Sequence, residues 1–477
     1  MPGRLPTSRT GRAMSSRSVG RCALLAVLAI TATGCSSTLT GEPTPANGLR
    51  QDVPDSDFEI VGSTDSEIDT TARNALADIN DFWAQNFPEL FGADFEPLTG
   101  GYYSIDPDNF DPDEYPDDIG CLDGDPENVA NNAFYCFPQS GGAGDNIVYD
   151  RTLLETLAAD YGRFLPALVM AHEFGHAVQA RKAPPSELSI VYETQADCFA
   201  GAWTGWVSED NAKHFNIRAP ELDGVVRGFL LLRDEPGSAA DDDSAHGSYF
   251  DRVSAFQEGF DSGLAACRDN YDDDRIFTLA EFSPDDRTAG NVSYQEAIQI
   301  SETTLETFWE SAFDQVGQQS FIAPELVGFD DDAPDCGDDA VERDLSFCPA
   351  DNTVSYDESD LTQLIADRIG DFAVTTAISL PYALAARNAV DRSVRGPEAI
   401  ASAVCATGWF AAQFYNGTLA DAATISPGDI DEAVIFLIDY GSKREILPEV
   451  GLSGFQLVDV FRQGFLNGGA DCGIFGG

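Results

Sequence analysis

Lysine and histidine are scarce in this sequence. Its 477 residues include four histidines and only three lysines, which are Lys182, Lys213 and Lys443. Acidic residues number 81 against 27 basic ones, so the formal net charge is -54. A surface of this charge repels nucleic acids and anionic lipids, and neither is an expected partner. Many carboxylates with almost no lysine suit a solvent salty enough to screen their mutual repulsion, so we expect a salt-loving or salt-tolerant source.

A long hydrophobic run is also missing. The apolar residues 22–30 follow five arginines, and this run is far shorter than the ~20 residues that cross a bilayer as a helix. The pattern predicts a signal peptide over residues 1–34. Cys35 follows small residues as in a bacterial lipobox, although Ala32 stands where a larger aliphatic residue is usual. We therefore expect export, with a lipid on Cys35 that anchors the chain at the extracellular side of a bacterial cytoplasmic membrane.

Residues 35–62 show no apolar periodicity and contain prolines and glycines at short intervals. This composition predicts a flexible tether between the membrane and the folded part of the chain. The hydrophobic share of 43% is enough for sizeable cores, and the length allows two or three domains.

Two of the four histidines lie in one short apolar stretch. The motif His172-Glu173-Phe174-Gly175-His176 falls within residues 164–180, which predict a buried helix. Four residues make about one helical turn, so His172 and His176 project from the same face and can hold one Zn²⁺. Glu173 can then take a proton from a water molecule on the metal. A hydrogen-bonded pair of core histidines is the alternative, and the scarcity of histidine favours the metal site.

A third ligand is expected a little downstream. Glu193 and Asp197 lie four residues apart in a largely apolar stretch, so on a helix both would face the same way. Glu193 can complete a site of two histidines and one glutamate whose fourth position stays open for water, as catalytic zinc requires. Asp197 can form a hydrogen bond to a metal ligand and so fix the orientation of that ligand. The alternative is that both carboxylates belong to a solvated acidic face.

Together with other motifs, these residues resemble a known family, the neutral zinc metallopeptidases of bacteria. Its motifs occur here in the same order and at similar spacing: Phe134-Tyr135-Cys136, residues 145–150, the His172 motif, residues 193–201, and His246-Gly247-Ser248 before Arg252. The resemblance covers roughly residues 68–267. It implies a gluzincin-like zincin fold, zinc held by His172, His176 and Glu193, and Glu173 as the catalytic carboxylate. It implies no particular substrate.

The two remaining histidines receive different interpretations. His246 lies at the end of the loop 234–247 and matches a His-Gly pair of the family, so it is a candidate to hydrogen-bond the oxyanion formed when water attacks a carbonyl. Its alternative role is that of a loop residue or a helix cap. Tyr149 and Tyr192 are weaker candidates for the same oxyanion contact. His214 stands beside a lysine in a polar stretch and is predicted to lie on the surface.

The chain repeats itself. Residues 253–267 and 458–472 keep Val, Phe, Gly, Phe, Gly and Cys in one register, and Phe134-Tyr135-Cys136 matches Ser346-Phe347-Cys348. We infer a tandem duplication of one domain, at residues 63–268 and 291–477, joined by an acidic linker at residues 269–290.

Ten cysteines are present, and eight remain once Cys22 is removed with the signal peptide and Cys35 carries lipid. An even number in an exported chain predicts disulfides. The four cysteines of the first copy each have a counterpart in the second, which predicts four bridges: Cys121 with Cys136, Cys198 with Cys267, Cys336 with Cys348, and Cys405 with Cys472.

The second copy lacks every candidate active-site residue. In the repeat register, His172, Glu173, His176, Glu193, Asp197 and His246 fall on or near Leu380, Pro381, Leu384, Ile400, Val404 and Gly451. The aromatic, glycine and cysteine framework remains, which indicates one catalytic domain and one degenerate copy without metal ligands. Pro381 within the corresponding helix costs about 3 kcal/mol unless that helix is kinked or begins there.

The alternation of short strands with dominant helices predicts an α+β fold. In the first copy we expect strands near residues 95–104 and 146–149, and helices near residues 68–87, 152–160, 164–180, 193–201, 222–232 and 252–263. The pairing of the strands is not readable from the sequence.

The sequence therefore favours an exported peptidase, with an endopeptidase as the expected type, that binds one Zn²⁺ per chain and acts on a peptide or protein. The competing hypothesis is a surface lipoprotein without catalysis, in which the doubled scaffold serves for binding. A closed structural zinc site would need a fourth protein ligand, and no free cysteine or histidine suited to that role is visible, which favours catalysis. A metallohydrolase that acts on another kind of substrate also stays open.

Overall fold

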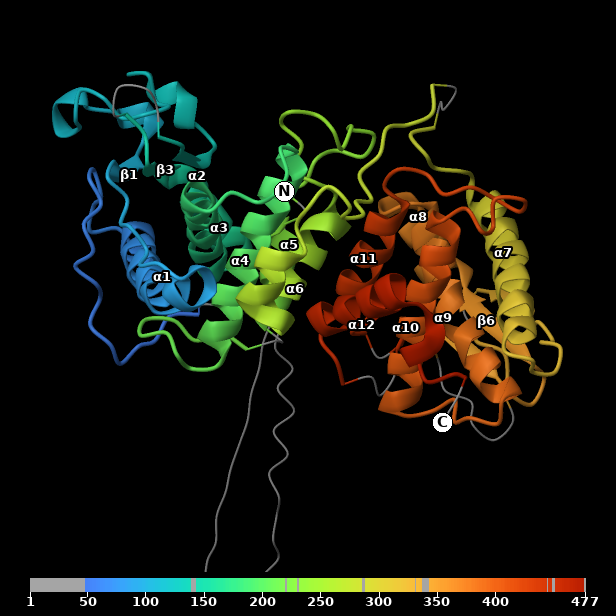
Figure 1. The fold of residues 1–477 in the computed structure, drawn as a ribbon. Coiled ribbons are helices and arrows are strands. Elements are labelled where there is room, and N and C mark those ends of the chain that lie inside the picture. Colours follow the sequence, from blue (N-terminus) through green and yellow to red (C-terminus); the bar gives the residue numbers. More distant parts are fainter. Residues whose placement is uncertain are drawn as a thin grey trace, which may run out of the picture. The chain divides into compact units, whose positions relative to one another are not determined.

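Helices dominate the chain, and two small sheets lie among them (Figure 1). The computed structural model describes residues 48–138, 143–218, 221–229, 231–284, 288–330, 332–336, 343–443, 445–447 and 451–475. The α+β class predicted from the sequence is confirmed. The predicted signal peptide and Cys35 lie outside the described residues. Among the described helices, none is long and apolar enough to cross a membrane.

The first half runs through three strands and six helices within its described residues. In chain order these are α1 (Glu67–Phe91), β1 (Gly101–Ile105), β2 (Ala133–Cys136), β3 (Asn146–Asp150), α2 (Arg151–Tyr161), α3 (Phe164–Arg181), α4 (Ser189–Ser208), α5 (Leu222–Phe229) and α6 (Tyr249–Asp269). Three of these helices begin at a side chain that caps them. Ser66, Asp150 and Ser248 accept hydrogen bonds from backbone N–H groups in the first turns of α1, α2 and α6.

The second half presents its elements in a matching order. They are α7 (Tyr294–Gln315), β4 (Glu325–Phe329), β5 (Leu345–Cys348), β6 (Thr353–Asp357), α8 (Gln363–Arg368), α9 (Asp371–Ala389), α10 (Pro397–Tyr415), α11 (Asp429–Asp439) and α12 (Gly454–Asn467). Pro381 lies inside α9, which continues on both sides of it. The predicted helix around this proline therefore forms over its full length.

The two sheets share one topology. Their strand orders are β1-β3-β2 and β4-β6-β5, and in each the central strand pairs in parallel with the first and antiparallel with the other. The registers correspond as well, since Tyr135 pairs with Ile147 and Phe347 pairs with Val354. Strands β2 and β5 both lie at a sheet edge. This correspondence supports the inferred duplication, which stays a prediction.

Two predicted connecting segments are packed where the structure describes them. Leu49 bridges to Phe215, and Val61 exchanges backbone hydrogen bonds with β1, so the expected tether is wrong from residue 48 to residue 62. Within the predicted linker, Tyr271 is buried and the backbone N–H of Thr278 donates to a buried carboxylate of α6. The linker does lie between α6 and α7, but it is held against the fold.

The four predicted disulfides are present. They join the expected partners, with Cα–Cα distances between 5.3 and 5.8 Å. Two of them, Cys198–Cys267 and Cys405–Cys472, tie α4 to the end of α6 and α10 to the end of the chain. Each therefore fixes a pair of elements far apart in sequence.

The glycines that recur in both halves allow two helix pairs to approach closely. A Cβ atom on Gly259 of α6 would lie 1.8 Å from the carbonyl oxygen of Cys198 in α4. A Cβ atom on Gly464 of α12 would lie 1.9 Å from the carbonyl oxygen of Cys405 in α10. No side chain fits at either place, which explains why the repeat keeps glycine there.

The halves cap each other's helices. The carboxylate of Asp431 on α11 accepts the backbone N–H groups of Tyr249 and Phe250, at 3.1 and 2.9 Å, at the start of α6. Reciprocally, Asp223 on α5 accepts the N–H groups at the start of α12, at 3.0 and 2.8 Å. Carboxylates stabilise helix N-termini by satisfying free N–H groups and by favourable interaction with the helix dipole. These contacts join α5 and α6 to α11 and α12.

We expect Asp431→Ala to lower the free energy of unfolding by about 1–3 kcal/mol, because it leaves buried N–H groups without an acceptor. Asp439→Ala is the matched control on the same helix. Its exposed ion pair with Arg227 should contribute less than about 1 kcal/mol. Denaturant unfolding of both variants checks this prediction, and equal stability of the two variants would contradict it.

Candidate metal centre

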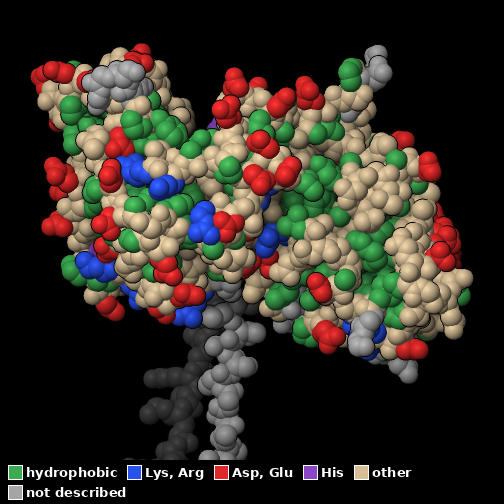
Figure 2. Space-filling view, in the orientation of Figure 1, with side chains coloured by type: hydrophobic (Ala, Val, Ile, Leu, Met, Phe, Trp, Pro, Cys, Tyr) green, Lys and Arg blue, Asp and Glu red, His purple; other side chains and the backbone are tan. Residues whose placement is uncertain are grey.

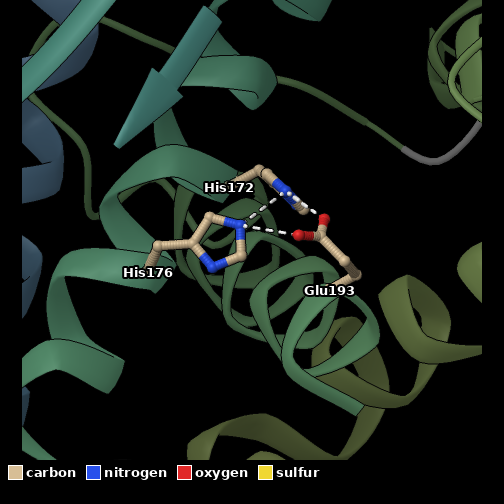
Figure 3. A group of neighbouring side chains, drawn as sticks. All are labelled: His172, His176 and Glu193. Atoms are coloured by element: carbon tan, nitrogen blue, oxygen red, sulfur yellow. Dashed lines mark hydrogen bonds and ion pairs between the residues drawn. The ribbon is translucent and has the colours of Figure 1, made fainter. Parts of the chain in front are cut away.

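Helices α3 and α4 bring the three candidate ligands together. His172 and His176 lie one turn apart on α3, and Glu193 lies in the second turn of α4. Figure 3 shows the two imidazoles and the carboxylate pointing at one another. The Nε2 atoms of the histidines are 3.2 Å apart, and the Glu193 carboxylate oxygens lie 3.2 Å from Nε2 of His172 and 3.4 Å from Nε2 of His176. The structure therefore brings together the three side chains that the sequence analysis proposed as ligands.

These distances fit a tetrahedral zinc ion. Ligands about 2.05 Å from a tetrahedral ion lie about 3.3 Å from one another. The two Nε2 atoms are 3.2 Å apart and Oε2 of Glu193 is 3.2 Å from Nε2 of His172, while the other oxygen, Oε1, is the one 3.4 Å from Nε2 of His176. Neutral imidazoles with their Nδ1 atoms protonated would present two Nε2 lone pairs to each other and to a carboxylate. Such a group of lone pairs is unfavourable without a cation between them. Two nitrogens and one carboxylate also form a donor set that zinc prefers.

The charge around the ligands favours a cation. Burial lowers the pKa of His172, but the charge of Asp197 and its hydrogen bond outweigh that effect and raise the pKa to about 10. Burial likewise raises the pKa of Glu193, but the two histidines overcome it and hold the pKa well below the usual carboxyl value. The site therefore gains energy from positive charge, which a metal ion can supply in place of protons.

A second layer of side chains orients both imidazoles. Nδ1 of His172 donates to Asp197 Oδ1 at 2.8 Å, and Nδ1 of His176 donates to Gln179 Oε1 at 2.8 Å. The fully buried Asp197 also accepts two hydrogen bonds from Arg252, at 2.7 and 2.8 Å. Because each Nδ1 donates, each Nε2 lone pair is directed to the centre. The sequence predicted the role of Asp197 but missed Gln179, although it lies one turn beyond His176.

Glu173 lies beside the ligands with its carboxylate held in place. Its Oε2 accepts the backbone N–H of Tyr135, from the edge strand β2, at 2.8 Å. Burial raises the pKa of Glu173 above the usual carboxyl value, and the neighbouring histidines oppose that shift. Glu173 is 7% exposed and lines the same cavity as both histidines, so it can reach a molecule placed at the centre. A role for β2 was not predicted, because four residues after an irregular loop carry no clear strand pattern.

The cavity has a volume of about 410 Å³ and a mixed lining. Residues 131–135 and Phe137 form one side, and apolar side chains of α2, α3 and α5 form much of the rest. The polar side chains that converge in it include the three candidate ligands, Glu173, Asp197, His246 and Arg252. An apolar cavity with a few convergent polar groups is the common form of a binding site.

His246 lies at the mouth of this cavity with 47% of its side chain exposed. Its backbone N–H donates to Asp234 Oδ2, and its Nδ1 lies 3.4 Å from Asp234 Oδ1. Hydrogen bonding to Asp234 raises its pKa above the usual histidine value. The structure thus places His246 among the residues that line the cavity.

Two other sequence expectations are corrected. Tyr149 is fully buried, and its hydroxyl donates a hydrogen bond to Asp69 Oδ1 at 2.7 Å. This hydroxyl is therefore not available to a substrate in the cavity. His214 is buried rather than on the surface, with 4% exposed, and its Nδ1 lies 2.7 Å from Asp78 Oδ1. Asp78 is 136 residues away, so nothing near His214 in the sequence reveals this partner.

The second half has leucines where the first has histidines. A separate group of three carboxylates lies near the starts of α9 and α11, formed by Asp371, Asp429 and Glu432. Glu432 accepts the N–H of Phe372 in the first turn of α9 and so caps that helix, whereas Asp429 accepts the N–H of Ser426 in the loop before α11. Zinc sites normally contain nitrogen or sulfur ligands, and this group has neither.

Asp197→Asn is expected to weaken zinc binding by about 10–100-fold, because the neutral amide no longer fixes and polarises His172. Asp234→Asn is the control, since Asp234 contacts His246 and not a candidate ligand. Chelator competition with a zinc-sensitive dye measures both affinities. An unchanged affinity in Asp197→Asn would show that the Asp197 contact does not support the metal.

Comparisons with known proteins bear on the region that contains this site. Residues 124–271 match the family model described as "Putative neutral zinc metallopeptidase". Two curated relatives, each named "Uncharacterized protein YpfJ", come from Escherichia coli strains K12 and O6:H1. Both are 30% identical over 151 residues, covering 27% of this chain and 50% of the relative. The chain thus spans about half the length of these relatives.

No solved structure is significantly similar to the chain. The family match ends before the second half begins, and it encloses the three candidate ligands, Glu173 and His246. Over residues 124–271 the chain is therefore similar to the neutral zinc metallopeptidase family.

Proposed function

We propose that the protein is a zinc-dependent peptidase with its active centre at His172, His176 and Glu193. The observation that carries this proposal is a set of two imidazole nitrogens and one carboxylate at tetrahedral-edge distances, next to a buried glutamate. The family match to residues 124–271 supports the metal and the reaction class. We propose one zinc ion per chain, because the described residues contain one group of two histidines and a carboxylate.

Glu173 is the proposed general base. A zinc ion held by the three ligands supplies Lewis-acid activation of a water molecule and of the substrate carbonyl. Glu173 takes the proton that the water loses and returns it to the leaving amine when the peptide bond breaks. Its hydrogen bond from Tyr135 keeps the carboxylate turned toward the cavity during both transfers. A pKa raised by burial makes the carboxylate a stronger base than an exposed glutamate.

We propose that the backbone of the substrate binds along strand β2. It is an edge strand, and the N–H of Tyr135 points outward to Glu173, which identifies the face turned to the cavity. An extended peptide can add to this edge by donating hydrogen bonds to its outward carbonyl groups, because the N–H of Tyr135 already donates to Glu173. Residues on both sides of the cleaved bond can lie along the strand, which favours an endopeptidase. His246, at the cavity mouth, is the proposed donor to the oxyanion.

We further propose that the protein is exported and held at the extracellular side of the cytoplasmic membrane by lipid on Cys35. The basic and apolar residues 1–34 and the cysteine that follows them support this location. Four disulfides also support it, because such bonds persist in oxidising compartments. Figure 2 shows acidic side chains spread over the visible face and basic ones in smaller number, as suits a salty solvent.

A binding platform is the second candidate function. The second half keeps the helices, sheet and disulfides of the first while Leu380 and Leu384 replace the histidines. A duplicated scaffold kept for binding alone would share these features. The two candidates differ in whether Glu173 is needed for turnover.

Glu173→Gln is expected to keep zinc and lose activity by about 10²–10⁴-fold, because the amide cannot accept the proton. The control is Glu187→Gln, which changes an exposed glutamate between α3 and α4 and should leave activity unchanged. Metal analysis and casein hydrolysis at high salt give the two readouts. Zinc binding without hydrolysis by the wild type would favour the binding platform, and a fully active Glu173→Gln variant would exclude Glu173 as the base.

A further inference from the structure

The chain between α5 and α6 forms part of the wall of the cavity at the candidate metal centre. We call residues 231–247 the wall segment, and three of them line the cavity, namely Leu231, Leu232 and His246. The wall segment closes on itself. The N–H of Asp234 donates to the carbonyl of Gly247 at 3.0 Å, and the Asp234 carboxylate accepts the N–H groups of His246 and Gly247 at 2.6 and 2.8 Å.

A single carboxylate of the second half holds both ends of the wall segment. Asp431 on α11 accepts a hydrogen bond from Arg233, the neighbour of Leu232, at 2.8 Å. Just beyond the other end, Asp431 accepts the backbone N–H groups of Tyr249 and Phe250 at 3.1 and 2.9 Å. The side chains of Arg233 and Asp431 are only 19% and 3% exposed, so their ion pair is shielded from solvent and stronger than a surface pair.

Further contacts secure the wall segment. A Cβ atom on Gly428, just before α11, would lie 3.2 Å from the Cβ of Pro236, so the second half packs closely against the wall segment there as well. From the first half, Arg252 on α6 donates to the carbonyl of Leu232. The position of the cavity wall therefore depends on both halves.

Apolar side chains of α2, α3 and α5 line the same cavity as the wall segment. Leu157, Leu165 and Leu168 are at most 3% exposed, whereas Leu231 is 58% exposed. A large apolar side chain placed in the cavity would contact these carbon atoms and remove part of Leu231 from water, which stabilises binding.

The charged side chains near the wall segment are already paired. Arg252 donates two hydrogen bonds to Asp197, which also accepts one from His172. His246 lies 3.4 Å from Asp234, and the remaining charged residues of the lining are the other candidate ligands and the proposed general base. A charged substrate side chain would lose its hydration here without gaining an unpaired partner among the described lining residues. The cavity thus favours a neutral, apolar side chain.

We propose that the second half positions part of the substrate site. Asp431, acting through Arg233 and the start of α6, holds the wall segment so that the cavity takes one large apolar side chain of a peptide. The inference rests on the proposed function, since it names the side chain that the peptidase binds next to the bond it cleaves. Asp431 and Arg233 are positioning residues, because neither is among the residues that line the cavity. The second half needs no metal ligands for this role.

Peptide binding to the full protein tests the apolar subsite. The protein carries Glu173→Gln so that the peptide is not cut, and the probes are two fluorescein-labelled hexapeptides of glycine and serine, with either leucine or alanine at the third position. We expect fluorescence anisotropy to show about tenfold tighter binding of the leucine peptide, because its side chain buries more apolar surface. Leu231→Ser should reduce this preference, and its exposed position makes a folding defect no part of the effect.

Arg233→Gln tests the role of the second half, because it removes the charged link and leaves Asp431 as the cap of α6. We expect it to weaken binding of the leucine peptide by about fivefold or more and that of the alanine peptide by less than about twofold. With Glu173 intact, the KM for the leucine peptide should rise while kcat and zinc content stay near the wild-type values. Arg233→Lys should restore most of the preference, since lysine keeps the positive charge beside Asp431.

Arg227→Gln is the matched control. It breaks another ion pair between the halves, with Asp439, but Arg227 is exposed and lies outside the cavity lining. This variant should bind both peptides as the parent does. Equal binding of the two peptides by the parent, an unchanged preference in Arg233→Gln, or an equal loss of preference in Arg227→Gln would overturn the proposal.

The two proposals fail separately. If wild-type protein with bound zinc hydrolyses neither peptide, while the leucine peptide binds selectively and this selectivity depends on Arg233, the apolar subsite stands and the peptidase is wrong. If wild-type protein hydrolyses both peptides with equal kcat/KM and the Glu173→Gln protein binds them equally, the peptidase stands and the inference is wrong.

Discussion

α3 and α4 approach each other at Gly175, where a Cβ atom would lie 3.0 Å from the Cα of Ala196. This close packing sets the distance across which the Glu193 carboxylate meets the two imidazoles, and a larger residue at position 175 would push the helices apart. Gly259 allows α6 to approach α4 even more closely, and α6 carries the Arg252 that holds Asp197. The candidate metal centre thus depends on two close helix contacts that only small residues permit.

The two halves share the residues that shape the fold and differ in the residues of the candidate site. Both keep glycine at the closest helix contacts, cysteines at the same places, and a sheet with the same strand order. Where the first half has the candidate ligands and the candidate base, the second has leucine, proline and isoleucine around a smaller cavity. Reciprocal capping by Asp223 and Asp431 joins the halves, so each supports the helices of the other.

The sequence predicted elements whose patterns are long and local. The helix expected at residues 164–180 forms as Phe164–Arg181, and the spacing of Glu193 and Asp197 places both on the face of α4 that meets His172. The internal repeat also yielded the four disulfides, since counterpart cysteines restricted the pairing. These inferences depend on periodicity and self-similarity, which a single sequence contains.

Features that depend on distant partners were missed. Strand β2 forms because β3 pairs with it, and its contact with Glu173 joins residues 38 positions apart. The burial of His214 depends on Asp78, and the caps at the start of α6 come from a residue about 180 positions later. The predicted tether failed from residue 48 because polar, proline-containing chain can still pair along an existing surface. The local composition of a segment does not reveal where in the sequence such partners lie.

The most direct test of the metal centre is X-ray absorption at the zinc edge on purified wild-type protein, together with its zinc content. The account predicts about one zinc per chain, bound by two imidazole nitrogens, one carboxylate and one solvent oxygen at about 2.0–2.2 Å. Absence of tightly bound zinc, or an ion bound without imidazole or with a fourth protein ligand, would contradict the account.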